Sequence, residues 1–145
     1  MDSICYRDLL ARIRTIPELE NSCGMTVGGR ADDPGMTNVP LPAAWIMHAR
    51  DDVIEDPKGA DDSGSALVPV VESVQYSTSV LIYVPYTTEA ELLDLWFPLL
   101  NSVKRAIHAK PAPNGSRWRY MGQKLAIVHP KRLAYEQHYS LTVLT

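Results

Sequence analysis

The chain has 145 residues, of which 46% are hydrophobic and 21% charged, and this composition is typical of one globular domain. No stretch approaches the roughly 18 to 20 consecutive apolar residues of a spanning helix, and the N-terminus lacks the basic and then apolar pattern of a signal peptide. We therefore expect a single domain over residues 1–145, made in the cytoplasm, with no membrane partner. The two cysteines, Cys5 and Cys23, encode neither a disulfide scaffold nor a zinc framework.

The net charge of -3 conceals an asymmetry along the chain. Residues 1–94 hold 16 acids against 6 bases, a net -10, whereas residues 95–145 hold 1 acid against 8 bases, a net +7. In one arrangement, strands from the two halves pair within one molecule and the charges interleave on its surface. In the other, the two poles lie on different faces, so that a copy meets its neighbour head to tail, as a closed ring requires. The sequence leaves both arrangements open.

The first half of the chain predicts a helix, a short strand and two loops. Apolar residues at helical spacing predict an N-terminal helix that ends at Pro17. Seven glycines and prolines in residues 21–42 predict a long irregular connection. Residues 43–49 are apolar on both sides, which predicts a buried strand, and the acids of residues 51–66 predict an exposed loop.

The clearest pattern is an alternating strand over residues 67–84. One parity is apolar, and the other is mostly serine and glutamine. No glycine, proline or asparagine interrupts residues 70–84, so this stretch would extend nearly 50 Å at about 3.3 Å per residue, well beyond the usual length. A bend near Ser77 would instead divide it into two strands of ordinary length, and the sequence favours neither alternative.

A capping box opens the next predicted helix. Thr88 stands at the cap and Glu91 three residues later, and the apolar positions predict a helix to about Ala109 with one face on a sheet. Pro98 falls on the polar side, where it bends the helix without entering the core. Phe97 lies outside the main apolar stripe, which makes it a candidate for contact with a partner.

Three strand-like pieces follow, at residues 117–121, 124–128 and 133–144, and the last alternates almost without fault. The predicted fold class is therefore α+β. It has a mostly antiparallel mixed sheet, two helices packed on one face and one very long central strand.

The sequence predicts no catalytic, metal or cofactor site, and so no enzyme. The four histidines never recur at i, i+3 or i+4, and there is no HExxH, CxxC or GxSxG motif. The glycines near residue 28 lack the Lys-Ser/Thr pair of a phosphate loop. With a pI of about 5.7, the chain is also a poor primary nucleic-acid binder, although aromatic and basic residues interleave at 117–120.

The order of these features resembles the phage tail terminator family over nearly the whole chain. The resemblance rests on residues 41–47 (Leu-Pro-Ala-Ala-Trp-Ile-Met), the charged loop after them and the strand over 68–84. It continues with the capped helix 88–109, residues 118–122 (Trp-Arg-Tyr-Met-Gly) and residues 132–139 (Arg-Leu-Ala-Tyr-Glu-Gln-His-Tyr).

This resemblance implies a structural virion protein without catalytic activity or cofactor. It would assemble with itself as a hexameric ring on the end of the tail tube, stop tube polymerisation and offer a surface to the head-tail connector. Its partners would be the tail tube protein, the connector and DNA that passes through the lumen without specific binding. Its place would be the head-proximal end of the virion tail, after synthesis in the host cytoplasm.

Charge and position suggest which residues serve such a ring. We expect an acidic loop on a ring surface or in the lumen, where it repels DNA phosphate: Asp51, Asp52, Glu55, Asp61 and Asp62. We expect a second group to face a neighbouring subunit or the tube: Phe97, Arg117, Arg119, Lys131 and Arg132.

Two other hypotheses remain. A head-tail adaptor or tail-tube subunit would share ring assembly but differ in its partner. A small α+β enzyme or ligand-binding domain would instead have a pocket between the long helix and the sheet, with His48, Tyr76 and His138 as its best residues.

Overall fold

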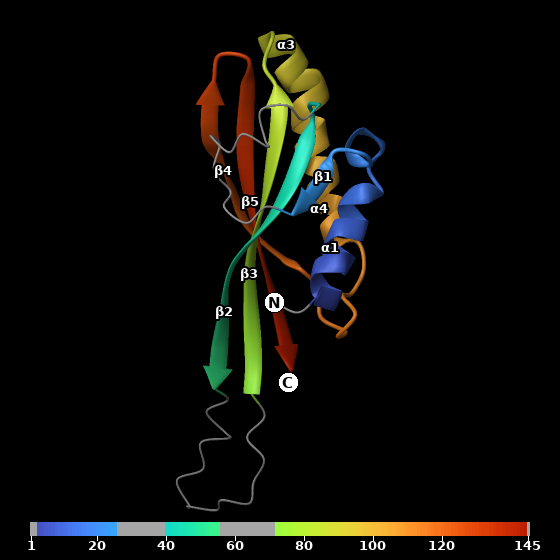
Figure 1. Cartoon of the computed structure of the whole chain (residues 1–145), viewed down its shortest axis with the longest axis vertical. Coiled ribbons are helices and arrows are strands. Elements are labelled where there is room, and N and C mark those ends of the chain that lie inside the picture. The colour runs from blue at the N-terminus through green and yellow to red at the C-terminus, as the bar shows by residue number, and fades with distance from the viewer. Residues whose placement is uncertain (1–2, 26–39, 56–71, 145) are drawn as a thin grey trace, which may run out of the picture.

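In the residues that the structure describes, 3–25, 40–55 and 72–144, five strands form one mixed sheet with two helices on one face (Figure 1). The structure is a computed structural model. The strand order is β1-β2-β3-β5-β4, in which β1 is parallel to β2 and all other neighbours are antiparallel. The predicted α+β class is therefore confirmed. The elements are α1 (Ser3–Arg14), a 3-10 turn (Pro17–Leu19), β1 (Cys23–Met25), β2 (Ala43–Glu55), β3 (Glu72–Pro85), α3 (Glu89–Glu91), a π turn (Leu92–Trp96), α4 (Phe97–His108), β4 (Arg119–His129) and β5 (Arg132–Leu144).

The middle strand, β3, is a single strand of 14 residues. Its pairing with β5 is continuous from Ser73 to Pro85 and passes through Ser77 without a register shift. The apolar parity faces the helices, because its members are buried in the core that the helices cover: Tyr76, Val80, Ile82 and Val84. The opposite parity begins with serine and glutamine and ends with Leu81 and Tyr83, which belong to a second, smaller cluster.

The long helix begins where the sequence predicts. The Thr88 hydroxyl accepts a hydrogen bond from the Glu91 amide at 3.2 Å, as a capping box requires. A π turn then precedes α4, with the Phe97 amide bonded to the Leu92 carbonyl. The π turn ends two residues before Pro98, which has no amide hydrogen to donate and is exposed on the polar side of the helix.

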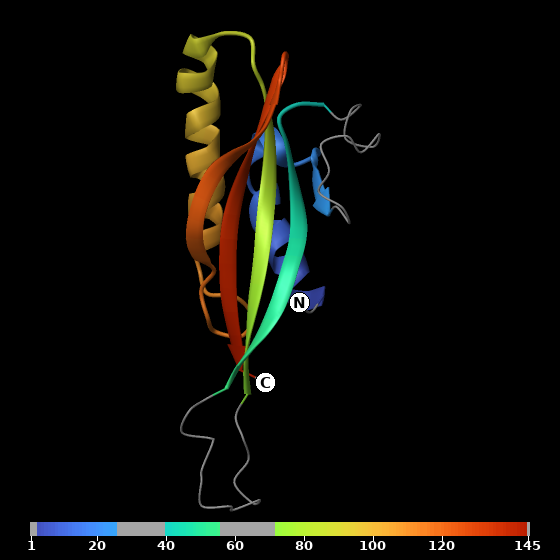
Figure 2. The ribbon, with the colours of Figure 1, turned by 90° about the vertical axis from the view of Figure 1, so that its left-hand side faces the viewer.

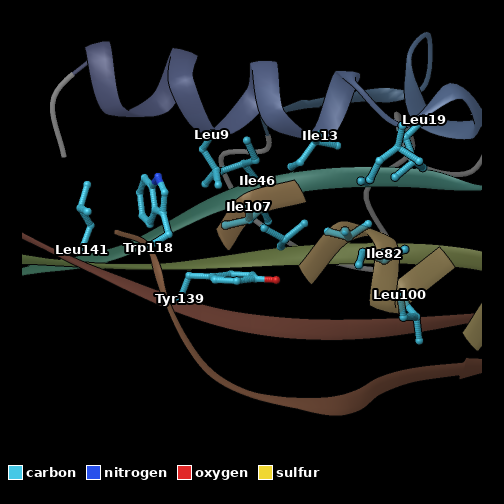
Figure 3. Close-up of a cluster of buried hydrophobic side chains, with 14 of the residues drawn as sticks. Leu9, Ile13, Leu19, Ile46, Ile82, Leu100, Ile107, Trp118, Tyr139 and Leu141 are labelled. Carbon is cyan, nitrogen blue, oxygen red and sulfur yellow. The ribbon is translucent and has the colours of Figure 1, made fainter. Parts of the chain in front are cut away.

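Both helices bury their apolar faces against the same side of the sheet. Figure 3 shows Leu9 and Ile13 of α1 directed toward Ile46 of β2, with Ile107 of α4 beside them. Trp118 and Tyr139 close this core toward β4 and β5, and both side chains are at most 1% exposed. Each large apolar side chain buried here contributes about 1.5–3 kcal/mol to folding. In Figure 2, α1 lies behind the strands, which leaves the other face of the sheet uncovered over much of its length.

One sequence prediction was wrong at β2. The strand was expected to end at residue 49, before the charged residues, but it continues to Glu55. Residues 50–55 pair with residues 72–77 of β3, so their backbone groups are satisfied by the ladder. Charged side chains are compatible with this because β2 lies near the sheet edge, where they point to solvent. A register shift between His48 and Arg50 separates the two halves of the strand.

Two further elements differ from the sequence prediction. The irregular connection contains β1, a three-residue strand that pairs in parallel with residues 44–46 of β2. The pieces at 117–121 and 124–128 are one strand, β4, with register shifts at Met121 and Ala126. Gly122, with φ +132°, directly follows the first of these bulges and adopts a backbone conformation that other residues rarely take.

Candidate functional site

Three of the five acidic residues expected in a loop lie on a projecting part of the sheet. Residues 50–55 of β2 and 72–77 of β3, here called the β2–β3 arm, extend beyond the helices (Figure 1). Asp51, Asp52 and Glu55 are thus strand residues, which corrects the loop prediction, because the ladder with β3 continues through them. Asp61 and Asp62 lie outside the described residues.

The arm presents a carboxylate on each of its two faces. Asp51 is opposite the core residue Tyr76 and therefore faces the side of the helices, whereas Asp52 is opposite Gln75 on the uncovered side. Both carboxylates have a local partner: Asp51 Oδ1 lies 3.2 Å from His48 Nε2, and Asp52 Oδ2 forms an ion pair with Arg50 Nε at 2.9 Å. Their side chains remain 41% and 42% exposed, so these pairs leave them accessible.

The arm also exposes apolar surface on both faces. Val53 is 62% exposed and follows Asp51 on the side of the helices, while Ile54 is 42% exposed on the other side. Among the described residues, no strand pairs with β2 beyond Ile46 on its outer edge, because β1 ends at Met25. Within the described residues, the outer edge of the arm therefore has no neighbouring strand and carries apolar side chains and carboxylates together.

The structure separates the basic residues that were grouped by sequence. Arg117 and Arg119 lie at the beginning of β4, whereas Lys131 and Arg132 lie at the hairpin between β4 and β5, the other end of the strand. The hairpin is held to the end of β3, since the Lys131 carbonyl accepts the Tyr86 amide at 3.0 Å. The four basic residues thus form two groups at opposite ends of an edge strand.

Phe97 is partly exposed, as expected for a residue outside the apolar stripe. It is 36% accessible and packs edge-on against Tyr135 of β5, with ring centroids 6.1 Å apart. Leu93, one turn earlier, and Leu125, opposite Tyr135, are 52% and 48% exposed. Phe97 therefore belongs to an exposed apolar strip between the long helix and β4.

A cationic hollow of about 570 Å³ lies between α4 and the first residues of β4, and we call it the α4–β4 hollow. It joins residues from both elements and has no acidic lining residue: Lys104, Arg105, His108, Ala109, Arg117, Arg119 and Tyr120. Sequence reasoning identified only Arg117 and Arg119. The spacing of positions 104, 105 and 108 on one helix was the available signal, but nothing in the sequence placed that helix turn beside β4.

Hydrogen bonds hold the walls of this hollow in place. Arg117 donates to the carbonyls of His108 and Ala109 at 3.2 and 3.3 Å, which caps the end of α4. His108 Nδ1 lies 3.0 Å from the Trp118 carbonyl, and because a carbonyl only accepts, Nδ1 carries the proton. The Lys104 ammonium lies 4.3 Å from the centroid of the Tyr120 ring, within the range of a cation–π interaction.

A buried arginine anchors the base of the same region. Arg12 of α1 is 3% exposed, pairs with Asp8 at 2.9 Å and donates to the carbonyls of Ile107, Lys110 and Pro111 at 2.6–2.8 Å. Asp8 also accepts from the Trp118 indole at 3.3 Å. One ion pair thus joins α1, the end of α4 and the beginning of β4.

A second buried polar group lies between α4 and the sheet. Gln137 is 1% exposed and donates to the Leu100 carbonyl and to Gln123 Oε1, each at 2.9 Å. Its own oxygen accepts from the Tyr139 hydroxyl at 2.6 Å. Burial raises the pKa of Tyr139 far above its ordinary value, with a smaller contribution from Tyr120. The alternation of β5 places Gln137 at a core position, but the sequence does not indicate its hydrogen-bond partners, so its role was not predicted.

The three residues proposed for a small-molecule pocket do not converge. His48 packs edge-on against Tyr6 of α1, with centroids 6.0 Å apart, and Tyr76 faces the same side. His138 lies on the uncovered side, where its Nδ1 is 3.1 Å from the Ser79 hydroxyl. A cluster of three or more potential metal ligands is absent from the part of the chain that the structure describes. Within these same residues, no helix has the length and apolar character that crossing a bilayer requires.

No family model matches the chain, and no curated protein sequence is detectably similar to it.

Proposed function

We propose that this chain is a ring-forming virion protein of the phage tail terminator type, which caps the tail tube, stops its growth and provides the surface for head-tail joining. The observation that carries the proposal is the segregation of charge onto opposite edges of the sheet. Asp51, Asp52 and Glu55 lie on the β2–β3 arm at one edge, and the basic α4–β4 hollow lies at the other. The inner strands contribute little to this asymmetry, because β5 carries only Arg132 and Glu136.

Strand direction supports head-to-tail assembly. The strands β2, β3, β5 and β4 alternate in direction, so the two outer long strands are antiparallel to each other. When copies are related by rotation about an axis roughly along the strands, β4 of one copy therefore runs antiparallel to β2 of the next. Such an interface joins two different surfaces and closes into a ring, as the resemblance to tail terminators implies.

The uncovered face of the sheet suits a water-filled passage. Its lower half carries small polar side chains that share one hollow with Arg50: Gln75, Ser77, His138 and Ser140. Arg50 in this hollow is paired with Asp52 at 2.9 Å, and the hydroxyl and amide groups add no positive charge, so a lumen lined in this way would hold DNA phosphate only weakly. A ring with this face inward is consistent with the expected non-specific role of DNA.

Tail tubes assembled without a terminator provide the direct test. The purified protein is mixed with such tubes, and electron microscopy scores rings at tube ends and tube length. We expect a ring at one end of each tube and arrested growth. Long stacks of the protein alone would instead indicate a tube subunit. If the tubes stay bare and the protein binds only to isolated head connectors, it is an adaptor.

A charge-reversed variant links the result to the edges of the sheet. Arg117→Glu combined with Arg119→Glu is expected to abolish capping at low salt. The matched control, Arg7→Glu combined with Arg14→Glu, changes the net charge equally on the exposed surface of α1 and is expected to cap normally. Equal capping by both variants would refute electrostatic assembly.

A further inference from the structure

The α4–β4 hollow combines basic and apolar side chains. This lining suits a binding partner that carries a carboxylate next to an apolar side chain. Five basic side chains surround it, and the Tyr120 ring and Ala109 add an apolar wall. The positive charge is uncompensated within the lining, although an acid elsewhere in the protein is the usual partner of such a cluster. An occupant with one or two carboxylates next to an apolar group would match both kinds of surface.

The β2–β3 arm of a second copy presents this combination. Asp51 and Val53 point to the same side of β2, the side of the helices, and the hollow lies on that side because α4 forms one of its walls. On the other face, Asp52 lies on the uncovered side of β2. Arg119 is opposite Ser140 and therefore lies on the uncovered side of β4, where it can pair with Asp52 of the second copy. Charge is thus complementary on both faces of the two edges at once.

Within one molecule the two surfaces cannot meet. They lie on opposite edges, with β3 and β5 between β2 and β4. The arm also projects past the helices that would otherwise cover its apolar residues (Figure 1). Contact between them therefore requires two molecules.

We infer that the α4–β4 hollow receives the acidic β2–β3 arm of a neighbouring copy, with the Asp51 carboxylate against the cations on the side of the helices, Asp52 against Arg119 on the uncovered side, and Val53 against Tyr120. This inference rests on the proposed ring and specifies the contact that closes it. The bulges at Met121 and Ala126 interrupt the regular backbone of β4, which hinders continuous strand pairing with another copy at this edge. Side-chain charge therefore determines which surface binds here. The hollow is hence part of an interface between copies and not a nucleic-acid site.

Two charge reversals and their mixture test this contact. The hollow variant is Arg105→Glu with Arg119→Glu, and the arm variant is Asp51→Lys with Asp52→Lys. The Arg105 side chain donates to the Asn101 carbonyl within its own helix. In sedimentation velocity at about 20 mM NaCl, we expect the wild type to associate with rising concentration. For each variant alone, the association constant is expected to fall at least tenfold. An equimolar mixture is expected to recover it, because the acidic hollow of one variant then meets the basic arm of the other.

The controls separate this contact from its alternatives. Thermal melting by circular dichroism establishes that both variants are folded, and Arg7→Glu with Arg14→Glu is the matched charge control. A wild type that stays monomeric at every concentration, or a mixture that stays monomeric, would overturn the inference. So would a labelled 12-nucleotide single strand that binds the wild type at about 150 mM NaCl and loses binding in the hollow variant. A mixture that associates but does not cap tubes would leave the contact intact and contradict the terminator function instead.

Discussion

At the scale of single residues, Arg12 is the side chain on which three elements depend. Its guanidinium satisfies Asp8 and three carbonyls near the end of α4, and removal would leave all of them without this donor in a buried site. We expect Arg12→Met to lower the free energy of unfolding by about 3–5 kcal/mol, the usual cost of breaking a buried ion pair by removing one partner.

Urea unfolding followed by circular dichroism measures this loss. Arg14→Met, two residues later on the exposed side of α1, is the matched control and should change the unfolding free energy by less than about 0.5 kcal/mol. A loss below about 1 kcal/mol for Arg12→Met would contradict the role assigned to the ion pair.

Tyr139 predicts how stability depends on alkaline pH. Its pKa in the folded protein is raised by burial, whereas in the unfolded chain it returns to about 10. The folded state therefore binds this proton more tightly, and its stabilising contribution is complete below about pH 10 and is lost as pH rises above that value. We expect tyrosinate absorbance to show at least one tyrosine of the seven that ionises only on unfolding. The variant Tyr139→Phe should remove that delayed step, and its persistence would assign it to another tyrosine.

At the scale of elements, β4 depends on a conformation that only glycine adopts easily. Gly122 has φ +132°, and a Cβ added there would meet nothing within 4 Å. The cost of Gly122→Ala is therefore one of backbone strain, about 1–3 kcal/mol. Chemical denaturation should show this loss, while Met121→Ala, at the exposed neighbouring position, should be nearly neutral. If both substitutions are neutral, the bulge does not need its glycine.

The elements that local sequence determines were predicted, and those that depend on a distant partner were not. The capping box at Thr88 and the alternation of β3 are local patterns, and both are present in the structure. The continuation of β2 through Asp51 was missed because a run of charge looks like a loop until a neighbouring strand satisfies its backbone. The α4–β4 hollow was only half predicted, since Lys104 and Arg119 become neighbours only when the helix packs on the sheet.

At the scale of the whole molecule, the two halves of the chain interleave in the sheet and yet keep their charges apart. β3 comes from the acidic half and pairs with β5 from the basic half, so neither half is a separate unit. The charged side chains concentrate on the outer strands, with acids on β2 and bases on β4. The two arrangements left open by the sequence are therefore combined, with intramolecular strand pairing inside the sheet and opposite charges at its edges.

This separation of charge competes with apolar surface as a cause of assembly. Leu93, Phe97, Leu125 and Val128 are 36–73% exposed near the other end of β4, and a second copy or a tube end would bury them favourably. Salt distinguishes the two causes. Chloride at a few hundred millimolar shortens the Debye length to a few ångströms and weakens charge pairing, whereas sulfate strengthens apolar burial.

We expect self-association and tube capping to fall together as NaCl rises from about 20 to about 500 mM, because exposed charges are screened within that range. Sedimentation velocity and electron microscopy of the same samples measure the two quantities. The variant Leu93→Ser with Val128→Ser, which removes apolar area without changing charge, should preserve association at low salt and its loss at high salt. Association that instead grows with sodium sulfate, and disappears in this variant, would assign assembly to the apolar strip and leave the charged edges to orient the subunits during encounter.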